Sequence, residues 1–264
     1  MVVLPPGTLL QLMYLRERLR LRSPGVFVEI GPGSGEITRL LLSLGWSGRS
    51  YDLEEDTVLA LRARFAKEID EQRFLALNED FLVSGTVGKA DLVISCMVME
   101  HLDDGAESVF LRQATDCLNP NGVMMSVVPA SPAHWGIEDD IAGHCRRYTR
   151  DAVQQLAAAN GWSIQHVAGL TFPVSNFLLP VSNFLVNRSE RQKLSLTALE
   201  RTKLSGRRQV AYKTHFPPLL SLLLNEITMY PLHVLQKLFR GSQHALVLFF
   251  EAQPMPAVVQ GGGY

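Results

Sequence analysis

Short apolar runs alternate with amphipathic segments over the first half of the chain. The apolar runs predict buried strands at 26–30, 48–53, 73–77, 90–95 and 123–128. Apolar positions spaced three and four residues apart predict helices at 36–44, 56–69 and 107–118, the last closed by an Asn-Pro-Asn-Gly turn. Strands that alternate with helices of this length indicate a mainly parallel sheet with right-handed crossovers.

The second half of the chain is less regular. A helix is predicted at 149–159, and two further strands at 162–170 and 244–251. Residues 171–240 are too many for a simple loop, so we expect a helical lid inserted before the last strand. The tail 253–264, with two prolines and three consecutive glycines, is expected to be flexible. All 264 residues then form one domain.

Composition and charge indicate a globular protein and argue against a nucleic-acid-binding one. Of the 264 residues, 47% are hydrophobic and 19% are charged, which is typical of a globular protein. The formal net charge of -1 provides no overall field to attract nucleic acid, so we expect no nucleic-acid partner. The spacing of Cys96, Cys117 and Cys145 fits neither a zinc ribbon nor a redox pair and indicates reduced thiols. Because the chain shows no signal-peptide pattern and no clear membrane-spanning run, we expect a cytoplasmic protein.

A glycine-rich turn follows the first predicted strand, in the order Glu29-Ile30-Gly31-Pro32-Gly33-Ser34-Gly35. Glycines here let the backbone turn tightly and approach a ligand, while the next helix offers free amide groups. The third glycine comes one residue too early for a dinucleotide fingerprint, and no Lys-Ser/Thr pair follows, which excludes a P-loop. The spacing instead resembles motif I of class I S-adenosylmethionine-dependent methyltransferases.

Further landmarks of that family stand at the ends of the next strands. Asp52 closes the second strand 21 residues after Gly31, where the resemblance implies a carboxylate that accepts both ribose hydroxyls. Asp80-Phe81 follows the third strand, where the family uses an acid and an apolar neighbour for the adenine. The segments at 91–102 and 119–123 look like the family's fourth motif and its turn into the fifth strand.

The resemblance covers 26–170 and the last strand. It implies a Rossmann-like three-layer α/β sandwich with a mainly parallel seven-stranded sheet, and S-adenosylmethionine as cofactor. The cofactor-binding residues it implies are Glu29, Gly31, Pro32, Gly33, Gly35, Asp52, Leu53, Asp80, Phe81, Ser95 and Met97.

Each landmark also has a purely structural explanation. The glycines could simply form a turn, Asp52 could cap the next helix, and Glu29 could be a solvated strand end. All of these explanations would have to hold together at the carboxyl ends of successive strands, where open α/β sheets bind their ligands. We therefore favour the cofactor site.

Methyl transfer to a hydroxyl needs alignment and the removal of a proton, so we expect a base near the ends of the fourth and fifth strands. His144 lies in Gly-His-Cys-Arg-Arg-Tyr, which looks like a segment of type 11 and type 12 methyltransferases. We expect His144 to be the acceptor-side base or hydrogen-bond partner; the alternative is that it caps the next helix or holds its loop. His101 and Tyr148 are further catalytic candidates.

Candidate acceptor-binding residues are Arg147, Phe172 and Phe177, although Arg147 could instead pair with an acid of 138–140. No metal site is expected. The related quinone O-methyltransferases carry Glu-x-x-Glu-His, which can hold a divalent ion, but Met97 replaces the first acid here. Glu100 and His101 alone are too few ligands to predict a site.

Basic residues gather in the lid before an apolar stretch, and both lie within 188–239. The pattern fits peripheral contact with an anionic membrane, or a helical cap over a hydrophobic substrate, which we favour. Both interpretations point to an apolar or lipid-linked acceptor, and we expect a small-molecule or lipid-linked one. The sequence therefore predicts a methyltransferase, most simply an O-methyltransferase. The alternative is a non-catalytic S-adenosylmethionine-binding or scaffold protein.

Overall fold

The structure is a computed structural model that describes residues 3–84, 88–197, 200–201 and 216–255. Its seven strands form one sheet in the order β3-β2-β1-β4-β5-β7-β6, which confirms the predicted mainly parallel sheet. All neighbouring strands are parallel except β7, which runs antiparallel to β5 and β6. The strands are β1 (Val26–Ile30), β2 (Ser47–Asp52), β3 (Phe74–Asn78), β4 (Ala90–Cys96), β5 (Leu118–Pro129), β6 (Trp162–Leu170) and β7 (Val247–Pro254).

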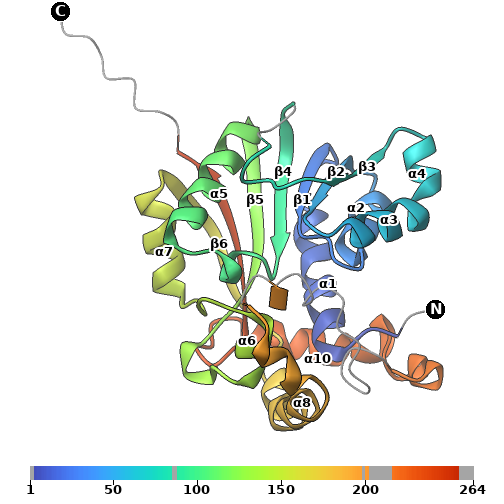
Figure 1. The fold of residues 1–264 in the computed structure, drawn as a ribbon, viewed down its shortest axis with the longest axis vertical. Helices are drawn as coiled ribbons and strands as arrows, with labels where there is room; N and C mark the ends of the chain where they lie inside the picture. Colours follow the sequence, from blue (N-terminus) through green and yellow to red (C-terminus); the bar gives the residue numbers. More distant parts are fainter. Residues whose placement is uncertain (1–2, 85–87, 198–199, 202–215, 256–264) are drawn as a thin grey trace, which may run out of the picture.

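Helices cover both faces of the sheet and so complete three layers (Figure 1). The longer helices are α1 (Pro6–Leu19), α2 (Glu36–Ser43), α3 (Glu55–Arg64), α5 (Asp104–Cys117), α7 (Arg150–Ala159), α8 (Val174–Glu190) and α10 (Glu226–Leu238). The shorter ones are α4 (Ala66–Asp70), α6 (Ile137–Ala142) and the 3-10 helices η1 (Met99–His101), η2 (Pro132–His134), η3 (Arg191–Ser195) and η4 (Pro218–Leu222). Side chains of α1, α2 and α3 form one hydrophobic core with the sheet, and those of α5 and α7 form the other.

Apart from shifts of up to three residues at the ends of several elements, the structure differs from the expectation in three places. The helix predicted at 56–69 breaks at Phe65, whose φ of -114° ends α3 before α4 begins. The turn expected at 119–122 belongs to β5, because Leu118 already pairs with Ala90 and the register then shifts before Leu92. The first two residues of the tail expected to be flexible extend β7, where Pro254 pairs with Trp162. Residues 256–264 of that tail lie outside the described part.

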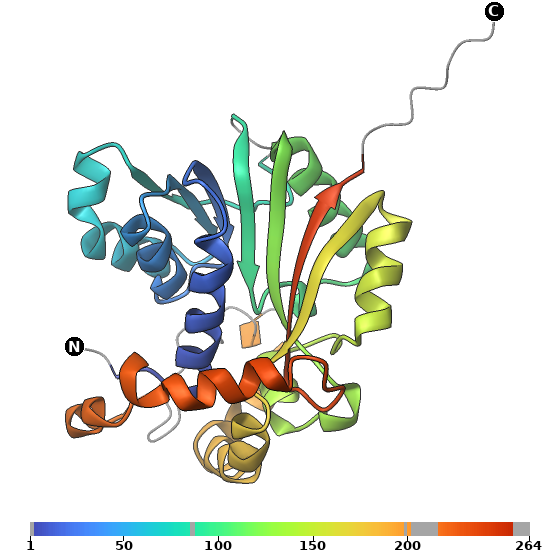
Figure 2. The same ribbon diagram turned by 180° about the vertical axis from the view of Figure 1, so that it is seen from behind.

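The helices α8 and α10 lie beyond the end of the sheet at which β4 terminates, and α1 runs from the sheet to α10 (Figure 2). Gln236 of α10 donates a hydrogen bond to the backbone oxygen of Leu10 over 2.9 Å. His233 of the same helix lies 2.8 Å from the carboxylate of Glu17. The described residues of 171–240 form α8, η3, η4 and α10. None of the helices in the described ranges is long and apolar enough to cross a membrane.

Candidate active site

Three glycines shape the turn between β1 and α2. Gly31, Gly33 and Gly35 have φ values of +66°, +52° and +80°, a region that side-chain-bearing residues rarely adopt. A Cβ at Gly31 would lie 2.6 Å from Cγ2 of Val98, and one at Gly35 would lie 2.6 Å from Cδ2 of Leu61. Pro32 between them is buried. The turn is therefore packed closely enough to exclude any larger residue at these two glycines.

Glu29 lies beneath this turn and supports it. The side chain is 2% exposed and accepts hydrogen bonds from the hydroxyls of Thr38, at 2.5 Å, and Ser50, at 2.7 Å. Burial raises the pKa of Glu29 to about 7. The sequence placed Glu29 among the cofactor ligands, whereas the structure shows a carboxylate that joins β1, β2 and α2.

Asp52 lies beside the glycine turn at the carboxyl edge of the sheet. Ile30 pairs with Tyr51, and the amide of Gly31 donates to the oxygen of Tyr51 over 3.0 Å, so Asp52 follows directly alongside. One oxygen of Asp52 accepts the amide of Glu54 over 2.9 Å, and Leu53 is 47% exposed. The chain order reverses between β1 and β4, and ligands of open α/β sheets bind at such a switch point.

Two of the predicted cofactor residues face the protein interior. Phe81 is 2% exposed and packs edge-on against Tyr51 and Phe110. Ser95 is 1% exposed, and its hydroxyl lies 2.9 Å from that of Ser126. Phe81, in the turn after β3, and Ser95, on β4, therefore point into the packed interior and not toward the edge of the sheet where the cofactor site was predicted.

The other two landmarks remain at the edge of the sheet. Asp80 is half-buried and accepts the amide of Leu82 over 2.8 Å, which closes the turn after β3. Met97, half-buried just beyond β4, has a φ of +55° and donates its amide to Val127 over 2.8 Å. Both residues stay candidates for the cofactor site.

His144 meets the segment after β4, although 43 residues separate it from His101. The amide of Cys145 donates to the backbone oxygen of Glu100 over 2.7 Å, which draws the two segments together. Nε2 of His144 lies 3.8 Å from Oε1 of Glu100, and the rings of His101 and His144 lie edge-on with centroids 4.8 Å apart. Two of the three predicted catalytic residues are thus adjacent.

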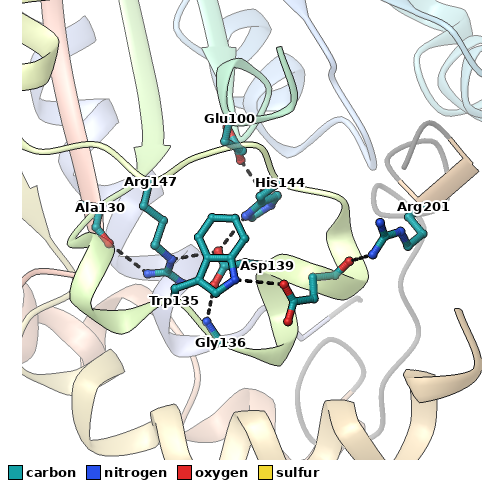
Figure 3. Close-up of polar contacts among 9 residues, drawn as sticks. Glu100, Ala130, Trp135, Gly136, Asp139, His144, Arg147 and Arg201 are labelled. Carbon is teal, nitrogen blue, oxygen red and sulfur yellow. Dashed lines mark hydrogen bonds and ion pairs between the residues drawn. The ribbon is translucent and has the colours of Figure 1, made fainter. Parts of the chain in front are cut away.

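Asp139 of α6 orients His144 (Figure 3). Its buried carboxylate lies 2.8 Å from Nδ1 of His144 and accepts hydrogen bonds from the side chain of Arg147 and the amide of Gly136, both also at 2.8 Å. Burial alone would raise the pKa of Asp139, but the hydrogen bonds from His144 and Arg147 lower it to about 2. His144 therefore has a fixed ring with Nε2 turned away from Asp139.

Arg147 is not available to an acceptor. Its guanidinium is held by Asp139 and by the backbone oxygen of Ala130, at 2.9 Å, and its side chain is 8% exposed. The alternative reading, in which Arg147 pairs with an acid of 138–140, is the correct one.

Glu100 is completely buried beside these histidines. Neither carboxylate oxygen has a hydrogen-bond partner among the described residues. Burial raises the pKa of Glu100 to about 8. In the sequence Glu100 stands out only as one of two ligands, too few for a metal site, because the sequence does not reveal which side chains end up facing one another.

Tyr148 anchors the loop instead of facing the reaction. Its hydroxyl, buried in the second hydrophobic core, donates to Glu107 of α5 over 2.5 Å. Arg146 also pairs with Glu107, at 3.1 Å, and with Asp104, at 2.8 Å. The prediction of a catalytic role for Tyr148 missed Glu107, which has no motif around it that would signal this contact.

The two predicted acceptor-binding phenylalanines differ in position. Phe172 packs edge-on against Phe239 with ring centroids 5.5 Å apart. Phe177 on α8 is 80% exposed, so no pocket encloses it, contrary to the expectation.

Comparisons with known proteins agree with this geometry. A family model described as a methyltransferase domain matches residues 9–167. Ribosomal RNA small subunit methyltransferase A from Synechococcus sp. (strain JA-2-3B'a(2-13)) is 36% identical over 74 residues, which are 28% of this chain and 25% of that protein. The match thus spans a quarter of that relative's length.

Solved structures share the fold at low sequence identity. A glycopeptide N-methyltransferase complexed with sinefungin matches 93% of this chain and 85% of its own, with a TM-score of 0.53 and 13% identity. Mitomycin 7-O-methyltransferase matches 62% of this chain and 50% of its own, with a TM-score of 0.52 and 15% identity. Magnesium protoporphyrin IX methyltransferase from Synechocystis PCC 6803 with bound SAH matches 62% of this chain and 77% of its own, with a TM-score of 0.52 and 16% identity.

The family model covers more than half of the chain, and the glycine turn and Asp52 stand where the sequence motifs placed them. The chain therefore belongs to the methyltransferase-domain family, and its resemblance to class I S-adenosylmethionine-dependent methyltransferases is confirmed.

Proposed function

We propose that this enzyme transfers the methyl group of S-adenosylmethionine to an oxygen atom of a small or lipid-like acceptor. One observation carries the proposal: the segment from Val98 to His101 touches the glycine turn through Val98 and faces His144 through Glu100 and His101. A donor bound at the turn and an acceptor bound at the histidines would then be neighbours, as an in-line displacement requires.

The residues present fit the cofactor. At Gly31 and Gly35 a Cβ would collide with neighbouring side chains, so only glycine fits at these positions. The turn therefore presents backbone without side chains there, which allows a ligand to approach closely. Asp52 is half-buried at the same edge, where a carboxylate can accept hydrogen bonds from ribose hydroxyls. We assign the methionine part to the turn and the ribose to Asp52.

His144 is the proposed acceptor-side base. Because Asp139 accepts from Nδ1, the lone pair of the neutral ring lies on Nε2, which faces the cluster with Glu100 and His101. A hydroxyl placed there can pass its proton to the imidazole as the new bond forms. An O-directed reaction suits this arrangement, since an oxygen acceptor has such a proton to lose.

The lid supports a lipid-like acceptor. On α8 the polar side faces the protein: Ser182 donates to Glu138, and Asn176 donates to the backbone oxygen of His244 over 2.8 Å. The apolar side faces outward, with Phe177 and Phe184 exposed by 80% and 65%. An outward apolar surface on the element that closes the site suits peripheral membrane contact and an acceptor taken from lipid.

Transfer of tritium from labelled S-adenosylmethionine into fractionated cell extract tests the proposal. We expect label in an apolar fraction. His144→Ala should slow turnover by about 10²-fold or more while affinity for S-adenosylhomocysteine stays unchanged, because general base catalysis typically contributes at least that much. The exposed His244 provides the control, and His244→Ala should keep full turnover.

Cofactor binding without transfer into any lipid, quinone or glycan fraction would contradict catalysis and favour the non-catalytic scaffold. Retained turnover in His144→Ala would remove this residue as the base. Label found in nucleic acid would contradict the small or lipid-like acceptor.

A further inference from the structure

A carboxylate and two imidazoles gather where η1 meets the loop after α6. Glu100, His101 and His144 each offer one ligand atom, and these atoms lie within 4.8 Å of one another. We propose that this cluster binds one first-row divalent metal ion of the Zn²⁺ type, held by a carboxylate oxygen of Glu100, a ring nitrogen of His101 and Nε2 of His144. The inference rests on the proposed function and deepens it, because the ion would receive the acceptor oxygen.

Glu100 gives the first reason. Its side chain has no exposed surface, and within the described ranges neither of its oxygens has a hydrogen-bond partner. Nε2 of His144 is 3.8 Å away, which is too long for a hydrogen bond. A buried carboxylate without a partner is costly, and buried charges are normally paired or bound to metals. An ion at this place would give the carboxylate of Glu100 the partner that it lacks.

His144 gives the second and independent reason. A histidine that binds a metal almost always donates its other ring N–H to a carboxylate or a carbonyl, which fixes the ring and the tautomer. Nδ1 of His144 makes this contact with Asp139 over 2.8 Å, and Asp139 is itself held by Arg147 and the amide of Gly136. The supporting groups behind the ligand are therefore already in place.

The dimensions and the donor set identify the class of ion. Ligands lie about 2.0 to 2.2 Å from zinc, so two ligands of one ion lie roughly 3 to 4 Å apart. The cluster has to contract by about 1 Å on this estimate, which small side-chain rotations can supply. Two imidazoles and one carboxylate suit zinc and its first-row neighbours better than magnesium or calcium. Three protein ligands leave a coordination position open, as in catalytic zinc sites.

The ion would change how the acceptor loses its proton. A bound divalent ion lowers the pKa of the oxygen that it coordinates, so a hydroxyl at the open position ionises near neutral pH. His144 would hold the ion in the metal-bound site, and the proton of the acceptor would pass to solvent water; its role as base applies to the metal-free site. The acceptor oxygen would then bond to the methyl carbon as the carbon–sulfur bond breaks and S-adenosylhomocysteine leaves.

Cobalt and zinc binding to the full chain test the proposal. We expect untagged protein, stripped with a chelator, to bind one Co²⁺ per chain with visible d–d absorption, and Zn²⁺ to displace it. Glu100→Gln and His144→Asn should weaken binding at least about tenfold, since loss of a ligand costs no less than loss of a group behind it. His244→Asn, at an exposed histidine, should bind cobalt as the wild type does.

Affinity for S-adenosylhomocysteine, measured on every variant, shows that the fold is intact. His101→Gln provides a further variant that leaves the buried Glu100 in place. Failure of the wild type to bind either ion, or wild-type affinity in Glu100→Gln and His144→Asn, would overturn the metal site. If cofactor binding and methyl transfer persist in that case, the proposed function stands without it.

Discussion

Glu29 is held between β1, β2 and α2 by two hydroxyl groups, and burial raises its pKa to about 7 from its ordinary value of 4.5. A raised pKa means that the folded state binds this proton more tightly than the unfolded chain does. The resulting stabilisation is fully present below about pH 4.5 and is lost as the pH rises through about 7.

Glu29→Gln removes this pH dependence while keeping an oxygen that can accept both hydrogen bonds. The free energy of unfolding of the variant, relative to wild type, should therefore rise between pH 5 and 7, by on the order of 3 kcal/mol in total. Urea unfolding across this range measures it, with the exposed Glu79→Gln as control. Parallel profiles for wild type and Glu29→Gln would show that Glu29 keeps an ordinary pKa.

Individual site residues could be predicted from the sequence only in part. Motif spacing placed Gly31 and Asp52 at the ends of two strands, and the resemblance of the segment around His144 to other methyltransferases singled out that residue. It did not separate Ser95, which faces inward, from Met97 at the edge of the sheet. It also could not find that Asp139 orients His144, since a run of three acids does not indicate which carboxylate is buried.

Among the elements, the turn from β1 into α2 depends most strictly on its sequence. Gly35 and Gly161 both have positive φ values, +80° and +72°. A Cβ at Gly35 would meet Leu61 and Phe65 at 2.6 and 2.8 Å, whereas nothing lies within 4 Å of one at Gly161. A side chain would therefore strain the backbone at both glycines, but it would collide with neighbouring side chains only at Gly35.

Gly161→Ala should cost roughly 1 to 2 kcal/mol, the strain of a left-handed residue. Gly35→Ala should cost roughly 1 to 3 kcal/mol more, because it also overpacks the core beneath the turn. Calorimetric binding of S-adenosylhomocysteine should weaken in Gly35→Ala and stay normal in Gly161→Ala. Equal stability and equal binding in the two variants would contradict a packed cofactor turn.

Hydrophobic periodicity predicted all seven strands and the alternation of strands and helices, because burial on both faces leaves a strong pattern in a parallel sheet. It missed local events that depend on tertiary packing. The break at Phe65 follows from its ring packing edge-on against Phe74, 5.4 Å away, and the extra length of β7 follows from pairing with β6. On α8 the polar face packs against the protein and the apolar face is exposed to solvent. Its hydrophobic periodicity is the same as that of an ordinary amphipathic helix, so the sequence did not reveal which face is exposed.

At the scale of the molecule, most of the exposed large apolar side chains among the described residues lie on the lid. Phe177 and Val181 of α8 are 80% and 57% exposed, and Ile227 of α10 is 87% exposed. Arg188 near the end of α8 and Arg191 at the start of η3 are exposed as well. Apolar groups beside basic ones are the pattern of a surface that binds anionic lipid.

Vesicles containing anionic lipid should therefore sediment the protein, and more strongly at low salt because the basic residues contribute. The double variant Phe177→Ser and Ile227→Ser should reduce the bound fraction several-fold with little change in stability. Leu59→Ser, at a 52% exposed position on α3, is the control and should bind like wild type. Equal binding by the lid variant and the control would contradict a membrane-facing lid.

Calorimetric titration with S-adenosylhomocysteine tests the central claim most directly, that the turn after β1 and the acid at the end of β2 together bind the methyl donor. Wild-type protein should bind one equivalent, and Asp52→Ala should bind about tenfold to hundredfold more weakly, because hydrogen bonds to a charged group are lost. No binding by the wild type, or unchanged affinity in Asp52→Ala, would contradict the account.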